Sequence, residues 1–181
     1  MRRHIAILLL VPSVLSLAVA PALHAASLPR ELAALSFLLG DWEGGGGAPG
    51  QSTGGTSFAP SLQDRVVIRT NFAVTPAASQ APASRHDDLM IIYVDERGMV
   101  RADYYDNEGH VIRYTMAIAS PGHVVFTSDP VPSGPQYRLT YQDSSPELVK
   151  GTFSIASPGK PGVFTPYLTW DMRRRSASGG R

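Results

Sequence analysis

The sequence predicts an all-β protein: an antiparallel up-and-down barrel of about ten strands that follows a short N-terminal helix. A helical spacing of apolar residues occurs only before Gly40, and short runs rich in Val, Ile, Tyr, Phe and Thr take over after Trp42. The intervening turns at 95–98, 106–109 and 120–122 carry the Gly and Asn residues of tight hairpins. Consecutive strands are therefore expected to be antiparallel neighbours, and closure of the sheet removes its edges.

The first 25 residues have the features of a secretory signal peptide. Arg2 and Arg3 precede an apolar run over 5–20, and small residues near position 25 fit cleavage before Ala26. The apolar run is shorter than the roughly 20 residues that a membrane-spanning helix needs. We therefore expect an exported protein, periplasmic or secreted, with no membrane segment after cleavage.

A short helix is predicted over 28–39, with Ser27 as its cap and Pro29 in its first turn. Leucines recur along it at helical spacing until Gly40 ends it. We expect this helix to cover one end of the barrel.

A single barrel domain is predicted over 26–173, with a proline-containing loop over 75–85 and a disordered tail over 174–181. The predicted strands are 42–47, 52–59, 65–74, 88–95, 99–106, 110–118, 123–128, 136–142, 148–156 and 164–173.

Composition excludes several classes of function. The 181-residue chain has a formal net charge of +1 and no cysteine, so it forms no disulfide and carries no lipid-anchored cysteine. Removal of 1–25 leaves 14 basic and 15 acidic residues, a balance that gives no reason to expect nucleic acid as a partner. The sequence also lacks a nucleophile elbow, a phosphate-binding loop and a dinucleotide fingerprint. A carrier is therefore favoured over an enzyme, and the expected partner is a small-molecule ligand.

Alternation along the strands predicts which side chains face the barrel interior. The simplest assignment turns the apolar and aromatic phase inward, for example Val66, Ile68 and Phe72 on strand 65–74. A barrel of eight strands already has room for one small ligand, and ten leave more. The alternative assignment turns five cations inward around an anionic ligand: Arg69, Arg101, Arg113, Arg138 and Lys150.

The segment Gly40-Asp41-Trp42-Glu43-Gly44-Gly45-Gly46 resembles the start of nitrobindin-type haem-binding barrels and, more loosely, the Gly-x-Trp of lipocalins. It is also similar to exported bacterial proteins of unknown function that share this lipocalin-like, or calycin, barrel. The nitrobindin resemblance implies haem held by one histidine on the last strand. Here that strand has no histidine, and Tyr167 stands at the matching place. Because tyrosinate can ligate ferric haem, haem stays among the candidate ligands.

The leading hypothesis is an exported lipocalin-like protein that encloses a small apolar or amphipathic molecule. Aromatic walls would supply contact area and hydroxyls would orient the guest. The predicted contact residues are Trp42, Phe72, Tyr93, Tyr104, Tyr114, Tyr137, Tyr141 and Tyr167.

Two alternatives remain open. One is a hydrolase or isomerase at the barrel mouth, because antiparallel order brings His86 and Asp88 to the same barrel end as Glu108 and His110, where they could bind Zn²⁺ or supply a general base. Turn chemistry already explains Asp106 without a ligand, so we assign no catalytic and no metal-binding residue from sequence. The other alternative is a filled barrel that acts only through its surface.

Overall fold

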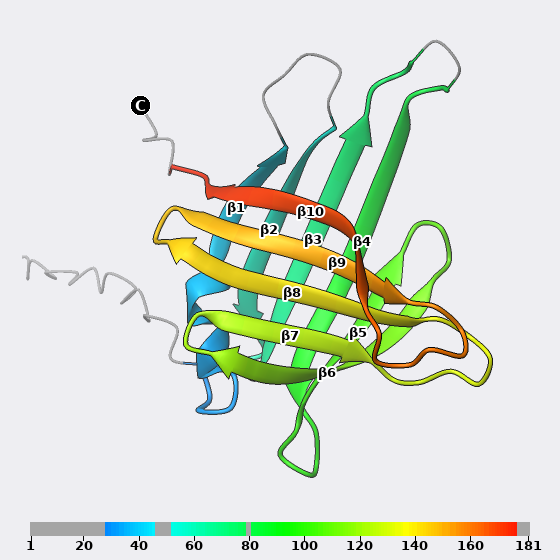
Figure 1. The fold of residues 1–181 in the computed structure, drawn as a ribbon. Helices are drawn as coiled ribbons and strands as arrows, with labels where there is room; N and C mark the ends of the chain where they lie inside the picture. The colour runs from blue at the N-terminus through cyan, green and yellow to red at the C-terminus, as the bar shows by residue number, and fades with distance from the viewer. Residues whose placement is uncertain (1–27, 46–51, 79–80, 177–181) are drawn as a thin grey trace, which may run out of the picture.

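The computed structural model describes residues 28–45, 52–78 and 81–176, and these form one closed antiparallel barrel (Figure 1). A short 3₁₀ helix, η1 (Ala33–Leu38), precedes the ten strands. The strands are β1 (Gly40–Gly45), β2 (Thr53–Ser61), β3 (Val66–Thr75), β4 (Ser84–Val94), β5 (Val100–Asp106), β6 (Val111–Ser120), β7 (His123–Ser128), β8 (Gln136–Ser145), β9 (Leu148–Ala156) and β10 (Thr165–Arg174).

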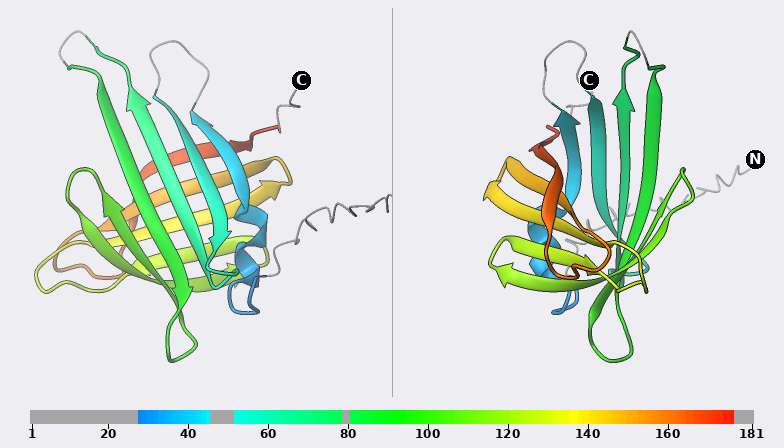
Figure 2. Two further views of the ribbon diagram at one scale, coloured as in Figure 1. Left: turned by 180° about the vertical axis from the view of Figure 1, so that it is seen from behind. Right: turned by 45° about the vertical axis from the view of Figure 1, so that its right-hand side comes forward.

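Each strand pairs with its neighbours in sequence, and β1 pairs with β10 to close the barrel. The predicted up-and-down barrel is therefore confirmed. The views in Figures 1 and 2 show β7–β10 crossing the direction of β1–β4 at a steep angle, so the barrel has two walls whose strands run in different directions.

The interior is packed with apolar and aromatic side chains. Tyr141 is fully buried and meets Phe58 and Phe126 edge to face, with ring centroids 5.4 and 6.4 Å apart. Such contacts are a favourable geometry for aromatic pairs. Trp42 is also buried, and its indole Nε1 donates a hydrogen bond of 2.7 Å to the carbonyl oxygen of Leu38. Trp42 thereby fixes η1 against one end of the barrel, which we call the closed end.

The predicted helix over 28–39 is wrong in type and length, because the structure has a six-residue 3₁₀ helix. Leu32, Leu35 and Leu38 are all fully buried. Their spacing of three residues places them on one face of a 3₁₀ helix, which has three residues per turn. Burial of these three leucines therefore favours the 3₁₀ conformation over the α-helix that the spacing of apolar residues predicted. The proposed cap, Ser27, lies outside the described residues.

The predicted inward phase of strand 65–74 is also wrong. Val67 and Arg69 are buried on β3, whereas Thr70 is exposed and Phe72 lies on the outer face, where the guanidinium of Arg85 stacks on its ring. Both phases of this strand are partly apolar, so hydrophobicity alone did not distinguish them. A partner for Arg69 across the sheet decides the orientation, as described below.

Most strand bounds agree with the prediction within two or three residues, but β4 begins at Ser84 rather than at 88. The difference shortens the predicted loop and places His86 inside the strand, opposite Ala73 of β3. At the other end of the chain, β10 continues to Arg174, whose guanidinium donates to the carbonyl oxygens of Leu39 and Phe37. The predicted signal peptide and residues 177–181 lie outside the described part. None of the helices described is long and apolar enough to cross a membrane.

Candidate functional site

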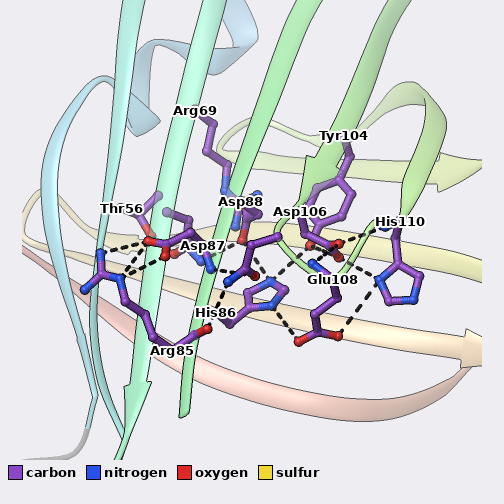
Figure 3. Close-up of polar contacts among 12 residues, drawn as sticks. Thr56, Arg69, Arg85, His86, Asp87, Asp88, Tyr104, Asp106, Glu108 and His110 are labelled. Atoms are coloured by element: carbon purple, nitrogen blue, oxygen red, sulfur yellow. Dashed lines mark hydrogen bonds and ion pairs between the residues drawn. The ribbon is translucent and has the colours of Figure 1, made fainter.

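Polar side chains gather at the end of the barrel opposite η1, where β4 begins and β5 ends (Figure 3). Two groups can be distinguished. The inner network lies on the interior faces of β2–β4 and consists of Thr56, Arg69, Asn71 and Asp88. The rim cluster lies on β4, on β5 and in the hairpin that follows, and consists of His86, Tyr104, Asp106, Glu108 and His110.

The inner network is built around a buried ion pair. Arg69 Nη1 donates to Asp88 Oδ1 at 2.7 Å, and the two side chains are only 6% and 3% exposed. Asn71 Nδ2 donates to Asp88 Oδ2 at 2.8 Å, while Thr56 Oγ1 donates to Asn71 Oδ1 at 2.6 Å. These hydrogen bonds link the four side chains, which stabilises the polar groups, and they leave Arg69 Nε without a partner.

Arg69 remains a cation in this setting. Burial lowers the pKa of its guanidinium, but nearby groups, among them the Asp88 carboxylate, more than compensate, so its pKa lies above the ordinary value. Burial likewise raises the pKa of the Tyr104, Tyr114 and Tyr141 hydroxyls, which therefore stay protonated. The barrel interior therefore combines the Arg69–Asp88 ion pair with neutral phenols.

His86 connects the inner network to the rim. Its Nδ1 atom lies 3.1 Å from Glu108 Oε1, and its Nε2 atom lies 3.2 Å from the Tyr104 hydroxyl and 3.4 Å from Asp88 Oδ2. Tyr104 in turn donates to Asp106 Oδ2 at 3.2 Å. The imidazole is one-third exposed, so it is open to solvent on one side and bounded by carboxylates on the other.

Asp106 is held by the hairpin that it begins. Its Oδ1 accepts hydrogen bonds from the backbone N–H groups of Glu108 and His110 at 3.0 and 2.9 Å, and its Oδ2 lies 2.8 Å from His110 Nδ1. Burial raises the pKa of Asp106, but these hydrogen bonds outweigh it and the net shift is downward. A nearly buried carboxylate is therefore kept ionised at the rim.

The structure brings together the four residues of the barrel-mouth alternative. His86 lies 3.4 Å from Asp88 and 3.1 Å from Glu108, and His110 Nδ1 lies 4.0 Å from Glu108 Oε2. Sequence reasoning did not include Tyr104 and Asp106 in this group, and it did not identify the Arg69–Asp88 pair. The available signal was the spacing of two residues, which places Arg69 and Asn71 on one face of β3 and His86 and Asp88 on one face of β4.

The predicted ligand-contact residues separate into three groups. Trp42, Tyr114 and Tyr141 are buried in the core, and Tyr104 and Tyr137 are partly buried and pack against it. Phe72 and Tyr93 face outward; the Tyr93 hydroxyl reaches Asp103 Oδ2, also on the outer face.

Tyr167, the proposed haem ligand, is 75% exposed. The register of β10 against β9 shifts between Pro166 and Leu168, so Tyr167 lies at an irregularity of the strand. Its ring meets Phe153 edge to face, and Phe153 in turn stacks on Tyr137.

The five-cation alternative holds for Arg69 alone. Arg101 pairs with Asp129, and Arg138 stacks on the ring of Phe164 on the outer face. Arg113 and Lys150 are exposed. Arg69 is the inward cation, and it pairs with Asp88, which lies diagonally across from it on β4. Arg113 and Lys150 have carboxylates directly opposite them on the outer side, Asp103 and Asp171.

Two shallow hollows lie on the outer face of the wall that carries the site. One, of about 260 Å³, is bordered by Phe72, Arg85 and Asp87, and the other, of about 400 Å³, by Thr70, Leu89 and Tyr105. These side chains face outward, but both hollows also border Asn71 of the inner network.

A scan of family models and a search of curated proteins find no match to this chain. The relationship to nitrobindin-type and lipocalin-like proteins therefore stays a prediction that rests on the Gly40–Gly46 motif. The barrel itself stands independently of it.

Proposed function

We propose that this chain is an exported lipocalin-like protein that binds a small amphipathic ligand inside the end of the barrel opposite η1. The observation that carries the proposal is that two of the three buried polar atoms without partners among the described residues are Arg69 Nε and the Tyr141 hydroxyl; the third is Arg138 Nε. An unpaired buried polar atom costs about 1–3 kcal/mol. An oxygen-bearing group of a guest would satisfy both atoms.

The surroundings favour a guest with one polar end. Arg69 is anchored to Asp88 through Nη1, which leaves its Nε edge free. Tyr104 and Tyr114 lie close enough to interact with the same guanidinium, and Tyr137 packs against the core beside them. A carboxylate or carbonyl oxygen would meet donors here, and an apolar portion would meet aromatic rings.

Export is supported by the basic and apolar segment at the start of the sequence. Haem ligated by Tyr167 is not part of the proposal, since that side chain is 75% exposed. Haem would need another ligand on the interior face, and it therefore has no special place among amphipathic guests.

The first test is native mass spectrometry of the protein recovered from a bacterial periplasm, compared with its mass after denaturation. A guest that dissociates on denaturation supports the proposal and gives its mass. The second readout is titration with anilinonaphthalene sulfonate, an amphipathic anion. Tyr141→Phe should weaken that binding about fivefold, since one hydrogen bond is worth about 1 kcal/mol.

Tyr167→Phe is the matched control, because it removes the same hydroxyl from an exposed position. Its affinity for the probe should equal that of the wild type. A protein that carries no adduct and binds no probe would contradict the carrier proposal and favour the filled barrel.

A hydrolase or isomerase at the rim is the second candidate function. It is favoured by the contact of His86 with Asp88 on one side and Glu108 on the other, an arrangement that orients an imidazole for proton transfer. If a substrate is found, His86→Ala or His110→Ala should abolish turnover with little loss of stability. Unchanged turnover in both variants would rule this function out.

A further inference from the structure

We infer that His86, Asp106 and Glu108 form a binding site for a divalent first-row transition metal. One ligand atom from each of these side chains lies within 4.8 Å of the other two. The three come from β4, from the end of β5 and from the hairpin that follows, and they converge in Figure 3. Imidazole with carboxylates is a donor set that such ions take.

The first argument is the charge at the rim. Asp88 and Asp106 are directly opposite each other on β4 and β5, and their side chains are only 3% and 4% exposed. Like charges opposite each other across a sheet are destabilising. Arg69 balances Asp88, and Glu108 adds a further negative charge beside Asp106. The rim therefore has an excess of negative charge that a cation would neutralise.

The second argument is a shortage of hydrogen atoms around His86. Neutral imidazole has one N–H group and one lone pair. A proton on Nε2 leaves the Nδ1 lone pair 3.1 Å from Glu108 Oε1, where both atoms are acceptors. A proton on Nδ1 leaves the Nε2 lone pair 3.4 Å from Asp88 Oδ2. The Tyr104 hydroxyl is 3.2 Å from both His86 Nε2 and Asp106 Oδ2 and can donate to only one of them. Each neutral tautomer thus places two acceptors near each other, and either a second proton on His86 or a cation between the acceptors removes the conflict.

The supporting contacts are those that a metal site requires. A metal-binding histidine commonly donates its other N–H to a carboxylate. With Nδ1 turned to the metal, Nε2 would donate to Asp88, which Arg69 and Asn71 hold in place. Asp106 is fixed by two backbone N–H groups through Oδ1, which leaves Oδ2 as its ligand atom.

Small side-chain movements complete the site. Zinc binds nitrogen and oxygen at about 2.0–2.2 Å, so two of its ligand atoms are at most roughly 4.4 Å apart. Glu108 is 60% exposed and free to move inward by the difference. His110 is close enough to join as a fourth ligand, since its Nδ1 lies 2.8 Å from Asp106 Oδ2.

The test uses the full chain and Zn²⁺ alone. Metal-free protein is dialysed against buffered Zn²⁺, and bound zinc is counted by elemental mass spectrometry, with affinity from calorimetry. We expect one tightly bound ion per chain. Glu108→Gln and His86→Gln should each weaken it by a factor of about ten or more. Replacement by Co²⁺ should give visible absorption bands that the two variants lose.

Glu96→Gln is the matched control, because Glu96 is an exposed glutamate in the other hairpin of β5. It should bind zinc like the wild type. The inference is overturned if the wild type binds no zinc, or if Glu108→Gln and His86→Gln bind it as tightly as the control. This outcome is separate from the proposed carrier function, which is read from the anilinonaphthalene sulfonate titration in zinc-free buffer.

Discussion

The two hairpins at the ends of β5 have the same backbone design and different surroundings. In the closed-end hairpin, Asp95 Oδ1 accepts the backbone N–H groups of Arg97 and Met99 at 2.9 Å each. In the rim hairpin, Asp106 Oδ1 accepts those of Glu108 and His110. Each turn contains a glycine with positive φ, Gly98 at 76° and Gly109 at 91°. Turn chemistry therefore accounts equally for both aspartates.

The difference lies in the residue pairs beside each turn. Val94 and Val100, which flank the closed-end hairpin, face each other, whereas Asp106 at the start of the rim hairpin faces Asp88 on the neighbouring strand β4. The second carboxylate oxygen of Asp106 is in contact with Tyr104 and His110. The same turn thus serves as a plain connection at one end and as a support for charged groups at the other.

The largest effect should come from Asp88, because its loss leaves the buried Arg69 cation unpaired. Asp88→Ala is expected to lower the free energy of unfolding by about 3–5 kcal/mol in urea denaturation. Glu96→Ala at the other hairpin should change it by less than about 0.5 kcal/mol. Equal losses of unfolding free energy in the two variants would mean that the buried ion pair does not stabilise the rim end more than an exposed carboxylate stabilises the closed end.

Alkaline pH should destabilise the protein through Tyr141, which is buried in the core. Burial raises the pKa of Tyr141 to about 12 from its ordinary value of 10.0. In the unfolded chain this hydroxyl has the ordinary pKa of 10.0. Its contribution to the free energy of unfolding is therefore complete below pH 10 and is lost as pH rises from 10 toward 12. Tyr141→Phe should remove roughly 2 kcal/mol of that alkaline loss, measured by urea denaturation at several pH values.

Tyr167→Phe is the exposed control in the same series, and its pH profile should follow that of the wild type. A Tyr141→Phe profile that also follows the wild type would contradict the burial argument.

The closed end contains backbone strain where the rim has charge. Leu62, Gln63 and Asp64 in the turn between β2 and β3 all have positive φ, between 52° and 65°. This region is costly for residues with a Cβ atom. Gln63→Gly should therefore raise the free energy of unfolding by about 1 kcal/mol, in spite of glycine's greater flexibility when unfolded. A thermal midpoint below that of the wild type would show that the turn is not strained.

The smallest change in stability should come from converting the rim turn into a copy of the closed-end turn. Glu108→Arg combined with His110→Met keeps Asp106 and Gly109, so the backbone hydrogen bonds remain. The free energy of unfolding in zinc-free buffer should stay within about 0.5 kcal/mol of the wild type. The rise in thermal midpoint on adding Zn²⁺ should disappear, and its persistence would place the metal elsewhere.

The sequence predicted the barrel because strand alternation and hairpin turns are local signals, and those at 95–98 and 106–109 are both present in the structure. It also predicted that His86 and Glu108 share a barrel end, since antiparallel order alone determines this. It did not predict which side chains of β3 face the interior, because Val66 and Val67 are equally apolar. Pairing of Arg69 with Asp88, a contact between strands, decides that orientation.

The 3₁₀ helix was missed for a related reason: burial of three leucines against Trp42 is a tertiary effect. Two of the predicted contact residues, Phe72 and Tyr93, lie on the outer face. Tyr93 lies on the opposite strand phase from the buried Ile92.

The most direct measurement is a crystal structure of the full chain grown with Zn²⁺ and recorded at the zinc absorption edge. An anomalous density peak between His86, Asp106 and Glu108, with none beside Asp95, is the predicted result. Crystals that contain zinc at other positions but none among these three side chains would contradict the distinction drawn between the two hairpins.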